Sequence, residues 1–336
     1  MNAQDPVAVV DVGSNTIKLL VARNTSGGGL DTLLSRTIDA RISRGIAKAS
    51  PVLGEEGMAA GLAAIGSLVA DARVWGAHRI VLVATSAVRS ALNGAEFAAR
   101  VRSECGHSLA ILSGEQEANL IGRGLLSDPA LTGLRDFYVF DLGGGSLECL
   151  FFRDQRITAA LSLPLGCVRL TERFVAAPEL PVSVSELDAV CSHTRDILAG
   201  SGFPFGSAVP AVFAGGTMTT ARVIRAAKLG CKLQDSPRTV TRDELARLLD
   251  QVAALPLERR PTEIKGLAAA RADVFPTALA TMLALADLGG FNSFLHSFYN
   301  LRYGIAAELL DSGDSPLIFV PSPSVCPPPQ TQPTDV

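Results

Sequence analysis

Two aspartates stand at the ends of short apolar runs, and each opens a glycine-containing turn. The first turn is Asp11-Val-Gly-Ser-Asn15 and the second is Asp141-Leu-Gly-Gly-Gly-Ser146. Because glycine has no Cβ, phosphate oxygens can approach successive backbone N–H groups in such turns, and these groups form an anion-binding nest. The two turns therefore predict phosphate contacts, with serine and asparagine side chains as further donors, at Gly13, Ser14, Asn15, Gly143, Gly144, Gly145 and Ser146.

A third glycine turn, Gly215-Gly216-Thr217, follows the apolar run at residues 209–213 and precedes a helical pattern over residues 218–229. The N-terminus of a helix offers free N–H groups, and the helix dipole favours negative charge there. We therefore expect Gly215, Gly216 and Thr217 to supply a third set of phosphate contacts.

Carboxylates among phosphate-binding amides imply a cation between them. Asp11 and Asp141 occupy equivalent places in the two turns, and Glu148 lies two residues beyond Ser146. Oxygen ligands suit Mg²⁺, which prefers carboxylate, water and phosphate oxygens. The dispersed histidines and cysteines show no spacing typical of zinc. The sequence therefore predicts a site for Mg²⁺, with Mn²⁺ as the alternative ion, at Asp141, Glu148 and Asp11.

A candidate general base lies in the helix that Ser113 opens, with Gln116 completing a capping box. Glu115 is expected only to complement the helix dipole. Glu117 lies two residues further into this helix than Glu115 and is predicted to face the cleft between the domains. A carboxylate there can deprotonate a water molecule for in-line attack on phosphorus. The Gly-x-Ser-x-Gly pattern of a serine nucleophile is absent from the sequence, so direct attack by water is favoured.

Arg89 is the candidate phosphate-contacting cation. It lies early in a predicted helix that follows the fully apolar run at residues 80–84. In open α/β sheets the ligand crevice lies at such strand ends, and a guanidinium there can hold a phosphate through two parallel hydrogen bonds.

The elements that position these residues repeat along the chain. Apolar runs at residues 7–10 and 17–22 flank the first turn, and runs at 137–140 and 147–152 flank the second, 130 residues later. A repeat of this length is typical of a duplicated domain. Periodicity predicts a strand at 110–112 and helices at 57–75, 86–104, from 114 to about 126, at 218–229 and over most of the remainder to residue 310.

Composition bounds the class of protein. The 336 residues are 48% hydrophobic with a mean hydropathy of +0.29, which is enough for two well-filled domains. A net charge of −3 gives no reason to expect nucleic-acid or membrane binding. The N-terminus lacks a basic leader, and the apolar stretch at 275–288 is interrupted and short, so we expect a cytoplasmic protein. The proline-rich tail, 312–336, is expected to be disordered.

Five motifs together resemble the exopolyphosphatase/guanosine pentaphosphate phosphohydrolase (Ppx/GppA) family of the actin-like ATPase superfamily. They are DVGSNT at 11–16, ATSAVRSALN at 84–93, SGEQEA at 113–118, DLGGGSLE at 141–148 and SLPLGC at 162–167. Gly215-Gly216-Thr217 and the segment Arg271-Ala-Asp273 extend the likeness, which covers about residues 7–310. Leu147 replaces the usual threonine, and the chain resembles the short form that lacks an additional HD-like helical domain.

The resemblance implies an α/β protein of two actin-like, ribonuclease H-like domains with the active site in the cleft between them. Domain I would span residues 1–126, completed by a C-terminal helix at 298–311, and domain II would span 127–297. The likeness also implies Mg²⁺-dependent release of terminal phosphate from polyphosphate, with Glu117 as catalytic base, Arg89 on phosphate and the acids Asp141, Glu148 and Asp11 at the metal. A homodimer is a further expectation from the likeness.

Other functions remain open at this point. The same chemistry could act on guanosine pentaphosphate instead of polyphosphate. An actin-like ATPase or sugar kinase would need an adenosine pocket and an acceptor-activating aspartate, whose signatures we do not find in the sequence. A non-catalytic phosphate-chain sensor could keep the glycine turns alone, and the joint presence of Glu117, Asp141, Glu148 and Arg89 argues against it.

Overall fold

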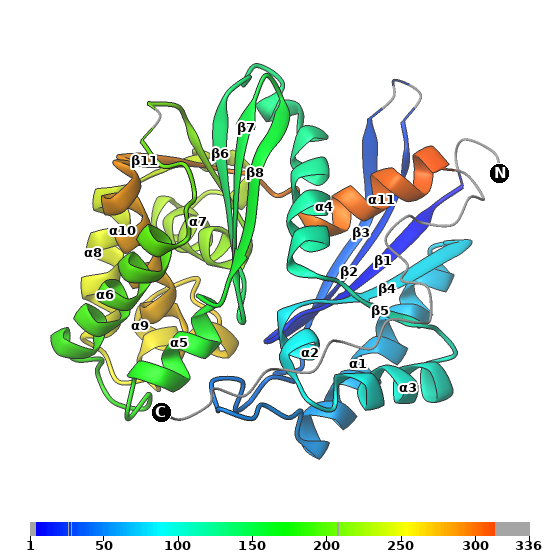
Figure 1. The fold of residues 1–336 in the computed structure, drawn as a ribbon, viewed down its shortest axis with the longest axis horizontal. Helices are drawn as coiled ribbons and strands as arrows, with labels where there is room; N and C mark the ends of the chain where they lie inside the picture. The colour runs from blue at the N-terminus through cyan, green and yellow to red at the C-terminus, as the bar shows by residue number, and fades with distance from the viewer. Residues whose placement is uncertain (1–4, 26, 28, 207, 313–336) are drawn as a thin grey trace, which may run out of the picture.

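The computed structural model describes residues 5–25, 27, 29–206 and 208–312. These residues form two α/β halves that lie side by side, each built on its own sheet (Figure 1). The predicted disordered tail lies outside the described residues from residue 313 onward.

Domain I is built on a five-stranded sheet in the order β3-β2-β1-β4-β5, in which β1, β2 and β3 are antiparallel neighbours and β4 and β5 run parallel to β1. The strands are β1 (Val7–Val12), β2 (Thr16–Asn24), β3 (Leu30–Asp39), β4 (Arg79–Ala84) and β5 (Leu109–Ile111). The helices are α1 (Glu55–Val74), α2 (Ser86–Ser90), α3 (Gly94–Cys105), α4 (Gly114–Leu126) and the C-terminal α11 (Leu301–Ser312).

Domain II repeats the antiparallel hairpin followed by parallel strands in a six-stranded sheet of order β10-β11-β9-β6-β7-β8. The strands are β6 (Phe137–Leu142), β7 (Leu147–Arg153), β8 (Arg156–Leu163), β9 (Ala211–Ala214), β10 (Thr239–Thr241) and β11 (Ser293–His296). The helices are α5 (Cys167–Phe174), α6 (Val184–Gly200), α7 (Gly216–Leu229), α8 (Arg242–Ala253), α9 (Arg260–Glu263) and α10 (Phe275–Gly289), with 3-10 turns η1 (Pro129–Leu131), η2 (Leu233–Asp235) and η3 (Ala269–Arg271).

The predicted repeat is visible in the register of the two hairpins. β1 and β6 share one burial pattern, four buried residues followed by a partly exposed aspartate and a buried residue. In the first hairpin Asp11 lies opposite Lys18, and in the second Asp141 lies opposite Glu148. Both aspartates therefore stand at the same end of their sheets, beside the glycine turns.

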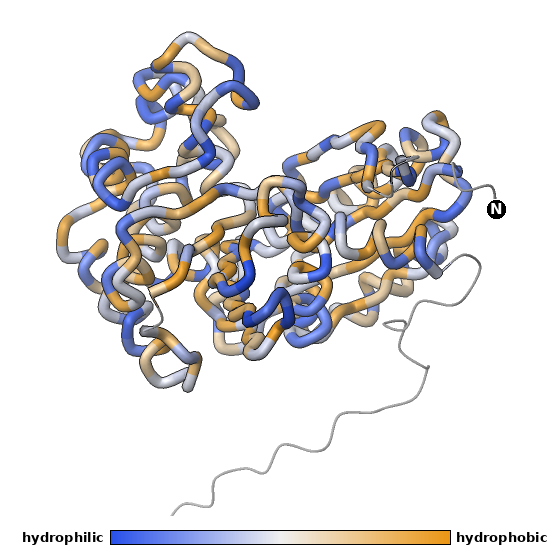
Figure 2. Tube along the Cα trace, turned by 90° about the horizontal axis from the view of Figure 1, so that it is seen from above, coloured by the Kyte–Doolittle hydropathy of each residue, from blue (hydrophilic) through white to orange (hydrophobic). Residues whose placement is uncertain are grey.

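The apolar core explains why the helices cover these sheets. Figure 2 shows hydrophobic residues gathered along the strands and hydrophilic ones concentrated in loops and on outer helix faces. Helix α1 has the length and apolarity of a membrane span, but 44% of its most apolar window is buried in the protein, and Leu62, Ile65 and Val69 pack on the sheet of domain I. The position and burial of α1 are those of a core helix.

Helix α11 carries the end of the described chain back to domain I. It packs against α4, β1 and β2, and the ribbon shows it beside the N-terminal strands (Figure 1). Ile305 and Leu309 of α11 belong to one apolar cluster with Val9 of β1 and with Val139 and Leu150 of β6 and β7. The two halves therefore share a core at α4 and α11.

Some elements differ from the sequence prediction. The single helix expected at 86–104 is wrong: α2 ends at Ser90 and α3 begins at Gly94. Between them Asn93 bonds both backbone groups of Leu53, and a Cβ at Gly94 would lie 2.2 Å from the Val88 carbonyl, so the chain turns there. The pattern also missed the edge strands β3 and β8 and the short strands β10 and β11.

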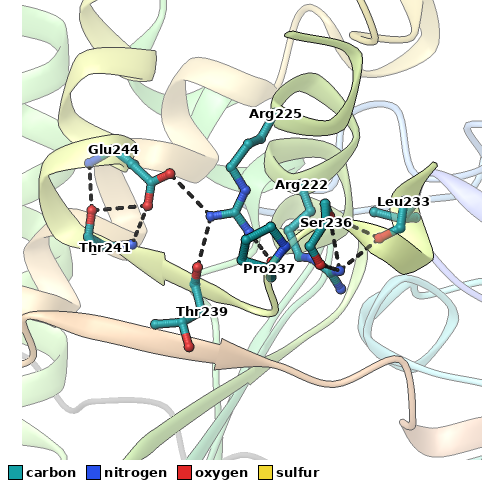
Figure 3. Close-up of polar contacts among 8 residues, drawn as sticks. All are labelled: Arg222, Arg225, Leu233, Ser236, Pro237, Thr239, Thr241 and Glu244. Atoms are coloured by element: carbon teal, nitrogen blue, oxygen red, sulfur yellow. Dashed lines mark hydrogen bonds and ion pairs between the residues drawn. The ribbon is translucent and has the colours of Figure 1, made fainter. Parts of the chain in front are cut away.

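A buried arginine anchors the connection that follows α7. Arg222 is fully buried and donates to the carbonyls of Leu233 and Ser236 at 2.8 and 2.7 Å and to Nδ1 of His296 at 2.8 Å. Burial, aided by nearby arginines, lowers the pKa of His296 to about 3, so its ring is neutral and can accept this bond. Arg225, one turn on, ties the same connection to β10 and α8 (Figure 3). The network fixes α7, whose N-terminus faces the cleft.

Candidate active site

One polar cavity lies between the two halves, at the glycine turns. All four carboxylates singled out in the sequence line it, namely Glu117, Asp11, Asp141 and Glu148. They share it with both hairpins. The remaining lining residues are Gly13, Ser14, Asn15, Thr16, Lys18, Thr85, Ser86, Ile121, Leu142, Gly143, Gly144, Gly145, Ser146, Cys167, Gly216, Arg271, Val274, Asn300 and Leu301.

The two glycine hairpins touch each other at the mouth of this cavity. A Cβ on Gly145 would lie 2.6 Å from Ser86 Oγ and 2.8 Å from Ser14 Oγ, and one on Gly144 would lie 2.7 Å from Ser14 Cβ. The absence of a side chain at these positions lets domain II close onto domain I. The glycines therefore serve the contact between the domains as well as the predicted approach of phosphate to backbone amides.

Gly145→Ala is expected to hold the hairpins apart and to lower kcat/KM of the catalysed reaction at least tenfold. Overpacking of this kind typically costs about 1–3 kcal/mol of unfolding free energy, so thermal melting should show a moderate loss. Gly133→Ala is the matched control because a Cβ there meets nothing within 4 Å. Full activity in Gly145→Ala would show that close hairpin contact is dispensable.

The third glycine turn supports the carboxylate of Asp141. Gly215 has a φ of +89°, and a Cβ there would lie 2.3 Å from Asp141 Oδ1, so glycine is required on both counts. Of the three predicted contacts in this turn, Gly216 lines the cavity, whereas Gly215 and Thr217 lie behind it and Thr217 is buried. The guanidinium of Arg271 packs directly over Gly216.

Glu117 is held by Arg89. Capping by Ser113 starts α4 so that Glu117, in its first turn, is buried at the cavity wall with 5% of its surface exposed. Arg89 Nη1 donates to Glu117 Oε2 at 2.8 Å and to the Leu112 carbonyl at 2.8 Å. Arg89 itself is one layer behind the residues that line the cavity. Its predicted contact with a phosphate stays a prediction.

The cavity strongly favours a proton or a cation on its carboxylates. Burial raises the pKa of Asp141 to about 6 and that of Glu148 to about 7, and burial also raises the pKa of Asp11. Burial, together with the neighbouring Glu148, raises the pKa of Glu117 well above its usual range, against the lowering effect of Arg89. A general base works best when its pKa lies near the working pH, which is the direction of this shift for Glu117.

Comparison with known proteins gives this arrangement a family. The profile of the Ppx/GppA phosphatase family matches residues 20–312. The chain belongs to this family.

Curated relatives of this Ppx/GppA phosphatase include the guanosine-5'-triphosphate,3'-diphosphate pyrophosphatases of Vibrio atlanticus (strain LGP32) and Vibrio vulnificus (strain YJ016). They are 29% identical over 307 residues and 28% identical over 305 residues. Each match covers 90% of this chain, and the chain spans 59% of the length of each relative.

Solved structures share the fold. An exopolyphosphatase from Cytophaga hutchinsonii is 23% identical with a TM-score of 0.80, over 91% of this chain and 98% of that one. The Aquifex aeolicus member of the Ppx/GppA family is 24% identical with a TM-score of 0.75, over 92% and 99%. The predicted two-domain α/β fold is confirmed, and it is the fold of these Ppx/GppA structures.

Sequence reasoning missed two cations of this site. Lys18 interrupts the apolar run of β2 between Ile17 and Leu19 and lies opposite Asp11. Burial lowers its pKa, while Asp11 opposes that shift. A lysine in such a strand is a usable signal because a buried ammonium requires an anionic partner. Arg271 was included in the family motif but was assigned no role, and it lines the cavity.

Several contacts beside the cavity hold the two domains together. Arg41 pairs with both carboxylate oxygens of Asp273 at 2.8 and 2.9 Å and, like the side-chain amide of Asn15, donates to the Ala270 carbonyl. The Glu172 carboxylate accepts from two backbone N–H groups in the loop after β3. The side-chain amide of Asn15 therefore takes part in the contact between the domains, although Asn15 also lines the cavity.

The donor set can be tested for a metal ion. Asp11 Oδ1 is shielded from solvent and has no hydrogen-bond partner, which is costly unless another group compensates. Within the described ranges, no three Asp, Glu, His or Cys side chains converge closely enough to hold an ion by themselves. Mg²⁺ is usually bound by one or two carboxylates together with water and phosphate oxygens. The residues present fit that mode, with Asp141, Glu148 and Asp11 as candidates.

Proposed function

We propose that this Ppx/GppA phosphatase is a Mg²⁺-dependent exopolyphosphatase, which releases terminal orthophosphate from inorganic polyphosphate. The observation that carries the proposal is the convergence of Glu117, Asp141, Glu148 and Asp11 on one cavity walled by two glycine hairpins. The other polar groups there are amides, hydroxyls and the cations Lys18 and Arg271, all of which recognise phosphate oxygens. A polyphosphate chain offers a protein few recognisable groups other than its phosphate oxygens.

The residues suggest how hydrolysis would proceed. The amides of residues 13–15 and 143–146 hold the terminal phosphoryl group in line with a water molecule beside Glu117. As the water oxygen bonds to phosphorus, Glu117 accepts a proton, and the bridging P–O bond breaks with its electron pair going to the shortened chain. Arg89 keeps the Glu117 carboxylate turned toward the water. When bound, Mg²⁺ would neutralise phosphate oxygens beside Asp141 and Glu148.

Guanosine pentaphosphate is the second candidate substrate, favoured by the names of the two Vibrio relatives. Its terminal 5′-phosphate offers the same anhydride bond to the same cavity. The two candidates differ in what lies beyond the first phosphates, so a direct comparison of substrates decides between them.

The deciding assay measures initial release of phosphate from short polyphosphate, long polyphosphate, guanosine pentaphosphate and ATP, each with Mg²⁺ and with EDTA. We expect polyphosphate to give the highest kcat/KM, and EDTA to abolish release. A higher kcat/KM for guanosine pentaphosphate would assign the second function. Binding of both compounds without turnover of either would instead indicate a sensor. Glu117→Gln, prepared in parallel, reveals any contaminating phosphatase.

A further inference from the structure

A chain of four polar side chains connects domain I with domain II at the wall of the cavity. Arg89 Nη1 donates to Glu117 Oε2 at 2.8 Å, while its Nη2 donates to Ser162 Oγ at 3.5 Å. Ser162 Oγ in turn donates to Glu148 Oε1 at 2.8 Å. One serine hydroxyl therefore connects the Arg89–Glu117 ion pair of domain I with a carboxylate of domain II.

The direction of these bonds is fixed by the groups at either end. A guanidinium has donors only, and an ionised carboxylate has acceptors only. The Ser162 hydroxyl therefore accepts a hydrogen bond from Arg89 and donates its own O–H group to the ionised Glu148 carboxylate. An apolar side chain at position 162 would leave both charged groups without this partner, and a lost bond to a charged group costs more than a neutral one.

Local structure holds Ser162 in this place from both sides. On the domain II side it lies directly opposite Glu148 in the antiparallel pair of β7 and β8. On the domain I side it meets Gly114, where a Cβ would lie 2.7 Å from Ser162 Cβ and 3.2 Å from its Oγ. Gly114 is the first residue of α4, which carries Glu117 one turn later. The serine is thus clamped between the strand of one carboxylate and the helix of the other.

Ser162 does not itself line the space where a substrate would bind. It lines an open groove on the outer side of the wall, together with Gly114, Glu115 and Asn119, and it is not among the described residues that line the catalytic cavity. Glu117 and Glu148 line the cavity itself. A role for Ser162 must therefore act through these two carboxylates.

We propose that Ser162 is a positioning residue that sets the orientation of Glu148 and of the Arg89–Glu117 pair together, across the contact between the two domains. The inference rests on the proposed function, in which Glu117 is the base and Glu148 holds the metal. Its consequence is that one hydroxyl aligns the base of domain I with the metal-side carboxylate of domain II.

The test compares Ser162→Ala with Thr158→Val, which removes a hydroxyl group from the same strand. Thr158 is the matched control because, within the described part of the chain, its hydroxyl donates to the Phe151 backbone carbonyl and contacts neither carboxylate. Loss of a group that orients a metal ligand typically costs 10- to 100-fold in metal affinity or activity. We expect Ser162→Ala to lower kcat at least tenfold with KM within about twofold, and to weaken Mn²⁺ binding, followed by calorimetry without substrate, by about tenfold. Thr158→Val should change neither quantity.

Two outcomes would overturn the inference. One is a Ser162→Ala variant whose kcat and Mn²⁺ affinity both stay within about twofold of wild type, even if its melting temperature falls, because that pattern is purely structural. The other is a wild type that binds no Mn²⁺. If the wild type binds Mn²⁺ but hydrolyses no phosphate compound, the proposed function fails, and the Mn²⁺ affinity of Ser162→Ala alone decides on Ser162. Should Ser162→Ala not fold, Ser162→Cys, whose thiol is a weak donor, is measured by the same two readouts and should fall between wild type and the expected alanine values.

Discussion

Replacement of Glu117 by glutamine is expected to lower kcat about a hundredfold or more, which is the scale of a lost general base. Glutamine keeps the size of the side chain and can still meet Arg89, but it cannot accept the proton of the attacking water. The phosphate contacts are proposed to come from the glycine hairpins and from Lys18 and Arg271, which line the cavity, so the affinity for polyphosphate should stay close to that of the wild type. Steady-state kinetics and equilibrium binding to unhydrolysed chain measure the two effects separately.

Glu115→Gln is the matched control for this prediction. Glu115 lies two residues earlier in the same helix turn, is exposed, and lines the outer groove instead of the catalytic cavity. The same chemical change at Glu115 should therefore leave kcat within about twofold of wild type, because surface changes away from special features have small effects. Equal losses in both variants, or unchanged turnover in Glu117→Gln, would move the base to another residue.

The parts of the site that the sequence could predict are those fixed by local geometry. A strand that ends in Asp followed by a glycine turn places its carboxylate at the sheet end, and a repeat of that unit places a second carboxylate at the equivalent point of a second sheet. The capping box at Ser113 likewise fixes where Glu117 begins its helix turn. These short-range rules singled out Asp11, Asp141, Glu148 and Glu117, and the structure places all four in one cavity.

Long-range contacts were beyond the sequence. Nothing within ten residues of Arg41 indicates its partner Asp273, which lies 232 residues away. The bridging role of Ser162 depends on Arg89, which lies 73 residues earlier and in the other domain. Both contacts form between the two domains, and a single sequence does not show which surfaces of the domains meet.

The missed strands have a different cause. β3 and β8 each lie at one edge of their sheet, and each has mixed, mostly partial burial along its length. Edge strands often carry polar and charged side chains, so the alternation that identifies a half-buried strand is weak there. Because β8 was not recognised, the register that places Ser162 opposite Glu148 could not be expected either.

The stability of the metal-free protein is expected to fall as the pH rises from 5 to 8. The pKa of Asp141 is about 6 in the folded protein against 3.8 ordinarily, and that of Glu148 is about 7 against 4.5. The folded protein therefore holds protons that the unfolded chain has already released, so the benefit of protonation is complete below about pH 4 and is lost as the pH passes the folded values. For Glu148 the loss is on the order of 3 kcal/mol, at about 1.4 kcal/mol per pKa unit. Ordinary carboxylates are ionised throughout this window and do not contribute to the change. The buried His296, whose pKa is lowered to about 3, acts in the opposite direction as the pH rises to about 6.5 and offsets part of this loss.

Mg²⁺ should reverse this loss because it binds the ionised carboxylates of the folded protein alone, and anything that binds only the folded state stabilises it by mass action. We therefore expect Mg²⁺ to raise the melting temperature more at pH 8 than at pH 5. Asp141→Asn removes one buried charge, so its metal-free melting temperature should depend less on pH and respond less to Mg²⁺. Asp154→Asn is the matched control, since its side chain is 70% exposed and does not line the cavity. A metal-free melting temperature that is flat from pH 5 to 8, with no response to Mg²⁺ at pH 8, would contradict a cation site at these carboxylates.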